Sequence, residues 1–264
     1  MCLPFINFTF MKTFVPILFL LILTARASAI DRYPEWFLFP QKYPQIVTGY
    51  SYSGNSALFD AENMYCAYRS CVVYGTLEIY NDPDRNEWLK NSDYFYYFSP
   101  DSVARIHGRL VRLDSFQTEL ITGDYIAAFS FTPADSQWHT PWIDVRDLPV
   151  PSWINKTYWQ DDRYYYGVGM YTATGNENDG WKTAEEQGIF TILTNLAVGV
   201  YKLRLADREM REQQSSMFEI SFLHLRFLLN HIEIVQRYPD LRNQLFYALV
   251  RIPKKDVFSP MMGR

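Results

Sequence analysis

Histidine is the first residue type to consider for metal or acid–base chemistry, because imidazole titrates near neutral pH and often binds metals. The chain has four histidines, at His107, His139, His224 and His231. None is at a metal-ligand spacing from another histidine, a cysteine or a carboxylate on one face. We expect His107 and His231, which recur at corresponding places in the sequence, to share a structural role. The sequence predicts no catalytic residue and no metal site.

The run Gly167-Val168-Gly169 is the nearest approach to a cofactor motif. It lacks the third glycine and the later acidic residue of a dinucleotide site. We expect these glycines to let a following helix approach the strand closely. Four carboxylates near expected helix starts are interpreted as favourable partners of the helix dipole; they are Asp60, Glu62, Glu185 and Glu186. No cofactor is predicted.

Aromatic residues make up 17% of the chain and are the remaining candidates for ligand binding. Exposed rings could stack against a glycan or peptidoglycan. The candidate stacking residues are Trp138, Trp142, Trp159, Tyr164 and Tyr165. Aromatic residues also suit half-buried strands, and we favour that interpretation for the tyrosine-rich runs.

The net charge of −4 and the pI near 5.6 argue against nucleic acid as a partner. Residues 1–29 are predicted to be a secretory signal peptide, with a lysine at position 12, an apolar run over 14–23 and cleavage after Ala29. Two alternatives stay open: the segment could remain uncleaved as a membrane anchor, and translation could start at Met11. No later segment is long and apolar enough to span a membrane. Peripheral contact with a membrane stays open.

Two cysteines, Cys66 and Cys71, remain after the predicted cleavage. Both fall within one expected helix, where a spacing of five residues places them roughly 8 to 9 Å apart and pointing away from each other. We therefore expect small core side chains, with an intermolecular bridge as the alternative.

The most informative pattern is an internal repeat. Pro34-Glu35-Trp36 corresponds to Pro151-Ser152-Trp153, and Ser53-Gly54-Asn55 corresponds to Thr174-Gly175-Asn176. Residues 128–133 correspond to 248–253, and the offset stays between 117 and 124 throughout. Small loop insertions between two copies of one unit produce such drift.

Hydrophobic spacing and turn residues predict the elements of each copy. In the first copy, we expect a strand over 45–51, a helix from Ser56 to about Tyr74 ended by Gly75, strands over 76–80 and 125–131, and regular structure over 103–113. In the second copy, we expect a strand over 164–172, a helix over 181–197 capped by Asp179, a strand over 198–205, a helix over 217–229, and strands over 232–237 and 245–252.

This order predicts the α+β class, with two tandem similar domains that each place helices on one face of a mostly antiparallel sheet. The domains are expected at 30–135 and 151–264. The linker between them, 136–150, contains Trp138 and Trp142 and is expected to pack against a domain.

The Pro-x-Trp openings, the Gly-x-Gly strand, the helix with recurrent Ala or Gly, and the closing strand at 245–250 resemble the lipoprotein-20 family of bacterial envelope proteins. The second copy is the better match, from Pro151 to about Val257. The resemblance implies small exported domains without established catalysis, whose relatives form rings or disks around the flagellar motor at the outer membrane. The chain departs from the family in having two copies and no lipidation cysteine.

The leading hypothesis is an exported, non-enzymatic envelope protein, periplasmic or associated with the outer membrane. It would act as a structural or assembly module, in a surface complex or one associated with the flagellar motor. Its partners would be envelope proteins or further copies of itself. The alternative is a glycan- or peptidoglycan-binding module that uses the candidate stacking residues.

Overall fold

The structure is a computed structural model, and it describes residues 31–258 apart from 53–55, 82–87, 120–121, 134–137, 173–175 and 212–218. The predicted signal peptide lies outside the described residues. The described part is mixed α+β, as predicted, with helices packed against antiparallel sheets. Within it, no helix combines the length and the apolar character needed to cross a bilayer.

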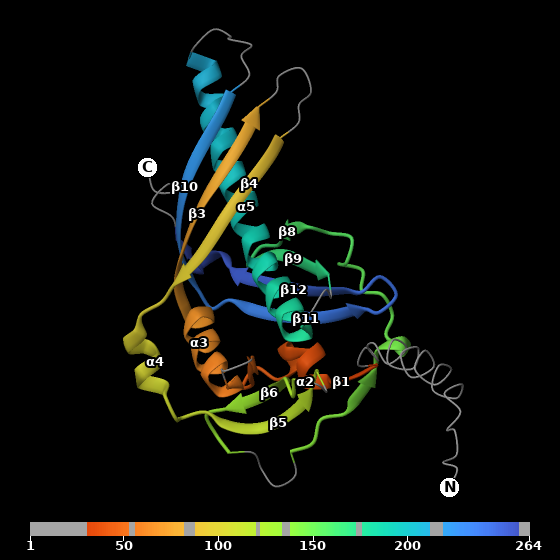
Figure 1. Cartoon of the computed structure of the whole chain (residues 1–264). Coiled ribbons are helices and arrows are strands. Elements are labelled where there is room, and N and C mark those ends of the chain that lie inside the picture. The colour runs from red at the N-terminus through yellow and green to blue at the C-terminus, as the bar shows by residue number, and fades with distance from the viewer. Residues whose placement is uncertain are drawn as a thin grey trace, which may run out of the picture.

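A three-stranded sheet forms one end of the molecule (Figure 1). In spatial order its strands are β2 (Val47–Tyr50), β6 (Tyr125–Ser130) and β5 (Val111–Gln117). Helix α3 (Ala57–Arg69) follows β2, and the hydroxyl of its N-cap Ser56 accepts the N–H of Phe59, as expected for this residue type. Helix α4 (Pro100–Ile106) precedes β5.

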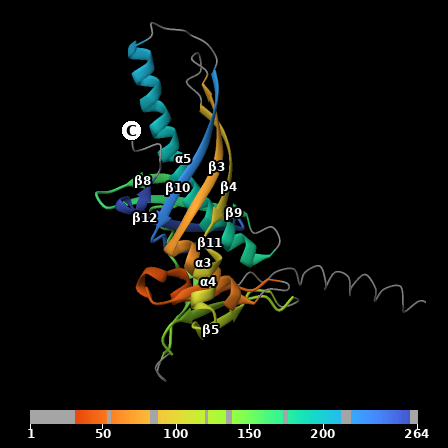
Figure 2. The same cartoon turned by 90° about the vertical axis from the view of Figure 1, so that its left-hand side faces the viewer.

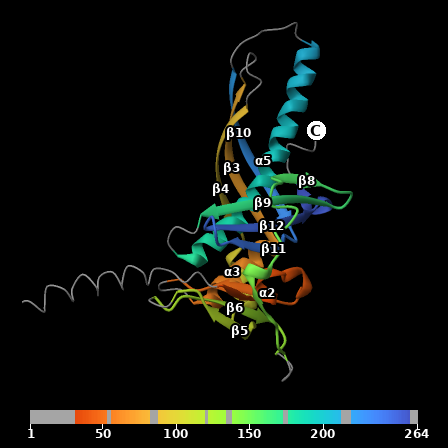
Figure 3. The same ribbon diagram turned by 90° about the vertical axis from the view of Figure 1, so that its right-hand side faces the viewer.

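A four-stranded sheet lies across the middle of the molecule (Figure 3). In spatial order its strands are β11 (Glu233–Asp240), β12 (Leu245–Pro253), β9 (Tyr164–Thr172) and β8 (Tyr158–Gln160). The long helix α5 (Glu177–Arg211) follows β9 and packs against one face of this sheet. A short 3₁₀ helix, η3 (Lys254–Asp256), continues from β12.

A second four-stranded sheet, with three long strands, projects away from the rest of the molecule. In spatial order its strands are β13 (Val257–Phe258), β10 (Glu219–Asn230), β3 (Ser70–Asn81) and β4 (Trp88–Tyr97). Figure 2 shows α5 along one face of β3, β4 and β10, with no other described element on the opposite face. We call this arrangement the projecting sheet.

The chain before β2 and the predicted linker pack together beside the three-stranded sheet. The elements are β1 (Arg32–Pro34), α2 (Glu35–Leu38), the 3₁₀ helix η1 (Pro40–Lys42), β7 (Trp142–Asp144) and the 3₁₀ helix η2 (Val145–Asp147). Strand β7 pairs antiparallel with β1, and Trp138 packs against the adjoining core. The expectation that the linker packs against folded structure is confirmed.

Helix α5 supplies side chains to two hydrophobic clusters. Ile189, Ile192 and Leu193 are fully buried with Leu77 and Phe227 of the projecting sheet. Nearer the start of the helix, another cluster contains the buried side chains Tyr33, Trp36, Phe37, Trp181 and Phe246. Each large apolar side chain buried in this way contributes about 1.5–3 kcal/mol.

The two halves of the chain, on either side of the linker, share an order and a pairing of elements. In each, a strand that is followed directly by a helix (β2 or β9) pairs with a later strand (β6 or β12), which also pairs with the strand just before it in the sequence (β5 or β11). The two Pro-x-Trp indoles also correspond, because Trp36 donates to Asp114 on β5 and Trp153 donates to Gln236 on β11. Strands β3 and β10, from different halves, pair in one sheet. Duplication and division into two domains stay predictions.

The predicted strands at 125–131, 164–172 and 245–252 are confirmed as β6, β9 and β12. The first helix was expected to reach Tyr74 but ends at Arg69, because residues from Ser70 onward pair with β10 and those from Val72 onward also pair with β4. Cys71 therefore lies on β3 and not in the helix of Cys66. Both cysteines are free and buried, and burial raises the pKa of the Cys71 thiol to about 12.

Three predictions in the second half are wrong. Helix α5 begins at Glu177, so Asp179 lies in its first turn and is not its N-cap. Helix α5 continues to Arg211 through the expected strand at 198–205. The expected helix at 217–229 is strand β10, in which Leu225, Phe227 and Leu229 are buried at alternate positions. A run this rich in apolar residues fits either period, and pairing with β3 along its whole length favours the strand.

The glycines of β9 allow α5 to lie close to the sheet, as the sequence predicts. A Cβ atom at Gly167 would overlap the carbonyl oxygen of Gly188, and one at Gly169 would overlap that of Ala184. In β2, a Cβ atom at Gly49 would overlap the carbonyl oxygen of Ala57 on α3. Both halves use the same device at the same strand–helix crossing.

We predict that Gly169→Ala lowers the free energy of unfolding by about 3 kcal/mol or more, because backbone atoms must move to admit the methyl group. The control is Gly199→Ala in the exposed part of α5, where nothing lies within 4 Å of the added atom. In that variant the free energy of unfolding is expected to rise by up to about 1 kcal/mol, because alanine has a higher helix propensity than glycine. Urea denaturation of both variants is the measurement, and equal stabilities would contradict the close approach.

Candidate functional site

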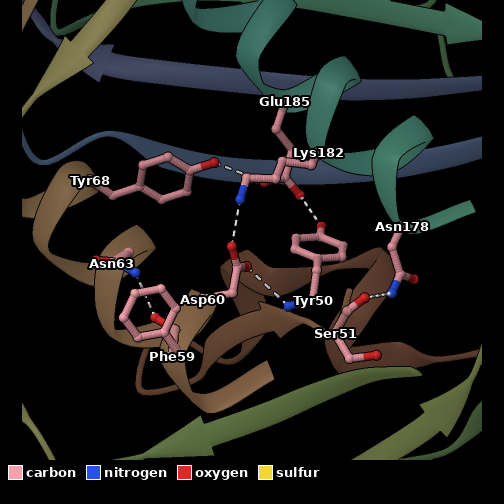
Figure 4. A network of polar contacts seen from close by, with 9 residues as sticks. All are labelled: Tyr50, Ser51, Phe59, Asp60, Asn63, Tyr68, Asn178, Lys182 and Glu185. Atoms are coloured by element: carbon pink, nitrogen blue, oxygen red, sulfur yellow. Dashed lines mark hydrogen bonds and ion pairs between the residues drawn. The ribbon is translucent and has the colours of Figure 1, made fainter. Parts of the chain in front are cut away.

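A buried ion pair lies where the two halves of the chain meet. The Nε of Arg237, on β11, donates to the Glu185 carboxylate of α5 at 2.7 Å, and both residues are at most 2% exposed. The Tyr50 and Tyr68 hydroxyls also donate to Glu185, as Figure 4 shows. Arg237 donates in addition to the backbone carbonyl of Phe37. The carboxylate thus binds groups from β2, α3 and β11.

Burial raises the pKa of Tyr50 and of Tyr68 well above the ordinary tyrosine value, so both hydroxyls stay protonated and donate. Every oxygen of Glu185 accepts at least one hydrogen bond. A carboxylate held in this way is a fixed acceptor and not a free base. We therefore interpret this cluster as a structural connection between the halves.

Beside this ion pair, a pocket of about 370 Å³ lies between α3, α5 and β4. Its walls combine aromatic rings with charged groups, and most of its residues come from α3. The lining residues are Tyr52, Phe59, Asp60, Asn63, Met64, Ala67, Tyr68, Tyr96, Phe98, Lys182 and Glu186. Pockets of this size hold small ligands.

The charges in the pocket are unequal. Asp60 is ion-paired with Lys182 and accepts the backbone N–H of Tyr50 (Figure 4). Burial nevertheless raises the pKa of Asp60, and Lys182 offsets part of that rise. Burial also raises the pKa of Glu186, again partly offset by Lys182. The pocket contains two carboxylates for one ammonium group.

Two hydroxyl groups in the pocket wall are unpaired. The hydroxyl oxygens of Tyr52 and Tyr96 are buried and have no hydrogen-bond partner among the described residues. Buried polar groups normally have partners, so an unpaired one calls for an explanation. Because both oxygens are shielded from solvent, neither faces the open space of the pocket as the side chains lie.

A third buried carboxylate, Glu177, lies in the first turn of α5. It accepts hydrogen bonds from the Tyr33 hydroxyl at 2.7 Å and the Trp181 indole at 3.2 Å. Burial raises its pKa to about 7, although both donors act in the opposite direction. Because its neighbours are core aromatic side chains, Glu177 affects the stability of the fold and is not placed to contact a bound ligand.

The uncovered face of the projecting sheet carries exposed and half-buried apolar side chains in two adjacent rows. One row crosses all four strands, and the second pairs Tyr74 with Phe95, whose rings stack at 5.4 Å. The residues of the first row are Phe258, Leu228, Val72 and Tyr97. Phe95 is 60% exposed, Tyr97 58% and Phe258 50%. We call these six residues the apolar face.

The candidate stacking residues from the sequence do not form one group. Trp142, the most exposed of them, lies on β7 beside Phe116, and Trp138 packs against the adjoining core. Trp159 and Tyr164 lie on the β8–β9 hairpin, where Trp159 stacks on Tyr166 at 4.9 Å and Arg251 covers Tyr164 at 4.4 Å. Tyr165 packs with the α5 cluster on the other face.

The histidines of the repeat each contact a carboxylate. His107 bonds to Glu62 at 2.9 Å, and His231 bonds to Asp256 at 3.1 Å.

Glu62 and Glu185 are fully buried, so their interpretation as partners of the helix dipole misses their main contacts. The buried ion pair and the pocket could not be recognised from spacing, because their residues come from distant segments.

No protein-family model, no characterised protein and no solved structure gives a significant match to this chain.

We predict that Glu185→Gln lowers the free energy of unfolding by about 3–5 kcal/mol, because it leaves Arg237 buried without a counterion. The matched control is Glu233→Gln, which removes a carboxylate from another arginine, Arg251, at a partly exposed position. In this control the free energy of unfolding is expected to fall by less than about 1 kcal/mol. Denaturant midpoints of both variants test this, and a small loss for Glu185→Gln would show that the ion pair is dispensable.

We predict that Glu177 makes the protein less stable as the pH rises from 4.5 to 7. Its pKa is about 7 when folded and about 4.5 when unfolded, so the folded state binds the proton more tightly over this interval. Glu177→Gln is expected to flatten this decrease of the unfolding free energy with pH. At pH 8 its unfolding free energy is expected to exceed that of the natural sequence by about 3 kcal/mol.

The control is Glu35→Gln, because a hydrogen bond from Lys42 lowers the pKa of Glu35 and gives the opposite slope. Unfolding free energies at pH 5 and pH 8 distinguish the two variants. An unchanged pH slope in Glu177→Gln would contradict the assignment.

Proposed function

We propose that this chain is a non-enzymatic assembly module that associates with a second copy of itself through the apolar face of the projecting sheet. The observation that carries the proposal is the position of six apolar side chains in two adjacent rows on a sheet face that no described element covers. Contiguous exposed apolar patches on soluble proteins commonly mark interaction sites.

A second copy is the favoured occupant because two sheets can pack face to face about 10 Å apart, with the side chains of the two facing surfaces interdigitating. The four-stranded sheet in the middle of the molecule has α5 on one face and Trp153 with its neighbours on the other. The projecting sheet therefore has the more open face, and a second copy supplies the same face. One charged residue, Arg226, lies beside Tyr74 on this face. Its guanidinium group is 5.7 Å from the centre of the Tyr74 ring, which keeps the charged side chain close to the sheet.

Export to the periplasm or the outer membrane is part of the same proposal. It rests on the predicted signal peptide and on the resemblance of the Pro-x-Trp and Gly-x-Gly segments to the lipoprotein-20 family. Under this proposal, other envelope proteins bind the dimer.

The alternative of glycan or peptidoglycan binding has less geometric support. The five candidate rings are divided among separate places, and several of their ring faces are occupied by other side chains. Trp142 is the ring that keeps the most exposed surface.

The test is sedimentation equilibrium of the protein lacking the predicted signal peptide, over a range of concentrations. We expect a dimer for the natural sequence and a monomer for the double variant Phe95→Lys with Tyr97→Lys. The control is Met170→Lys, which also replaces an exposed apolar side chain by lysine, at a 51% exposed position on another sheet.

The control is expected to keep the dimer. A natural protein that stays monomeric at every concentration would rule out self-association. A double variant that dimerises as well as the control would move the interface away from the apolar face.

A further inference from the structure

The pocket between α3, α5 and β4 contains a carboxylate that makes no direct ion pair with a described residue. Lys182 is ion-paired with Asp60, and the Glu185 carboxylate behind them is held by Arg237. Glu186, one turn after Lys182 on α5, accepts no hydrogen bond from any described residue. A cationic ligand would therefore complete the charge balance of the pocket.

The walls around this carboxylate are aromatic. Tyr52, Tyr68, Tyr96 and Phe98 all line the pocket. The ammonium group of Lys182 lies 5.2 Å from the centre of the Tyr52 ring, so this ring already contacts a cation. Aromatic ring faces attract ammonium groups electrostatically, and the attraction is stronger where water is excluded. Such walls bind the methyl or methylene groups around a charged nitrogen.

The unpaired hydroxyls define a further feature of the ligand. Tyr52 and Tyr96 each have a buried hydroxyl oxygen without a partner among the described residues. A neutral hydroxyl can donate or accept, so a polar group on the ligand can satisfy one of them after a small movement of the tyrosine side chain. The ligand should combine a cationic nitrogen with a hydrogen-bonding group.

We propose that this pocket binds a small organic ammonium ion that carries a hydroxyl or similar polar group. In this arrangement Glu186 is the counterion, the aromatic side chains surround the carbon atoms next to nitrogen, and the Tyr52 or Tyr96 hydroxyl bonds the polar group. A volume of about 370 Å³ is near the lower end for ligand pockets and suits a metabolite-sized molecule.

The test is isothermal titration calorimetry at pH 8 with choline and with 3,3-dimethylbutan-1-ol, a neutral molecule of the same shape. We expect choline to bind and the neutral alcohol to bind at least about tenfold more weakly. Glu186→Gln is expected to weaken choline binding by about tenfold. The matched control is Glu177→Gln, which changes a buried carboxylate on the same helix outside the pocket and should leave the affinity unchanged.

A second readout uses the unaltered protein. Glu186 faces Asp60 from α3, Lys182 and Glu185 from α5, and the hydroxyls of Tyr52 and Tyr96. Burial raises the pKa of Glu186, so the carboxylate is protonated as the pH falls and choline binding should weaken between pH 8 and pH 5.

Three results would overturn the proposal. They are no choline binding at about 10 mM, equal binding of choline and its neutral counterpart, and unchanged choline affinity in Glu186→Gln. Equal binding of the neutral alcohol would identify the pocket as a site for uncharged ligands instead.

Discussion

Arg237 is buried between the two halves of the chain, and the single carboxylate of Glu185 balances its charge. A guanidinium group shielded from water must be ion-paired and hydrogen-bonded, because the uncompensated charge would cost several kcal/mol. Its partners come from α2, through the Phe37 carbonyl, and from α5, while Glu185 also binds Tyr50 and Tyr68. This requirement fixes β11, α5, β2 and α3 relative to one another.

The position of Glu185 depends in turn on how closely α5 approaches β9. Gly167 and Gly169 leave room for the helix backbone, and a side chain at either place would push the helix outward. With the start of α5 held there, the rest of the helix lies along the projecting sheet (Figure 2). The same helix thus supports the buried ion pair, one wall of the pocket and the covered face of the projecting sheet.

Strand β4 connects the two surfaces to which we assign interactions. Its side chains alternate between the faces of the sheet, so Tyr96 lines the pocket while Phe95 and Tyr97 lie on the apolar face. Tyr94 packs on the pocket side as well, with its ring stacked on Phe190 of α5. A strand shared in this way places a ligand site and an association surface on opposite sides of one sheet.

The sequence by itself determined the α+β class, strands β6, β9 and β12, the N-cap Ser56 and the role of the β9 glycines, because these depend on local spacing and residue size. Only the tertiary structure decided that residues 198–205 are helical and that β10 is a strand, since long-range pairing and packing outweigh ambiguous local periodicity. The buried ion pair and the pocket were also decided at that level. Glu185 and Arg237 are 52 residues apart, and Tyr52, Tyr96 and Glu186 come from three separate segments that meet only when the chain is folded.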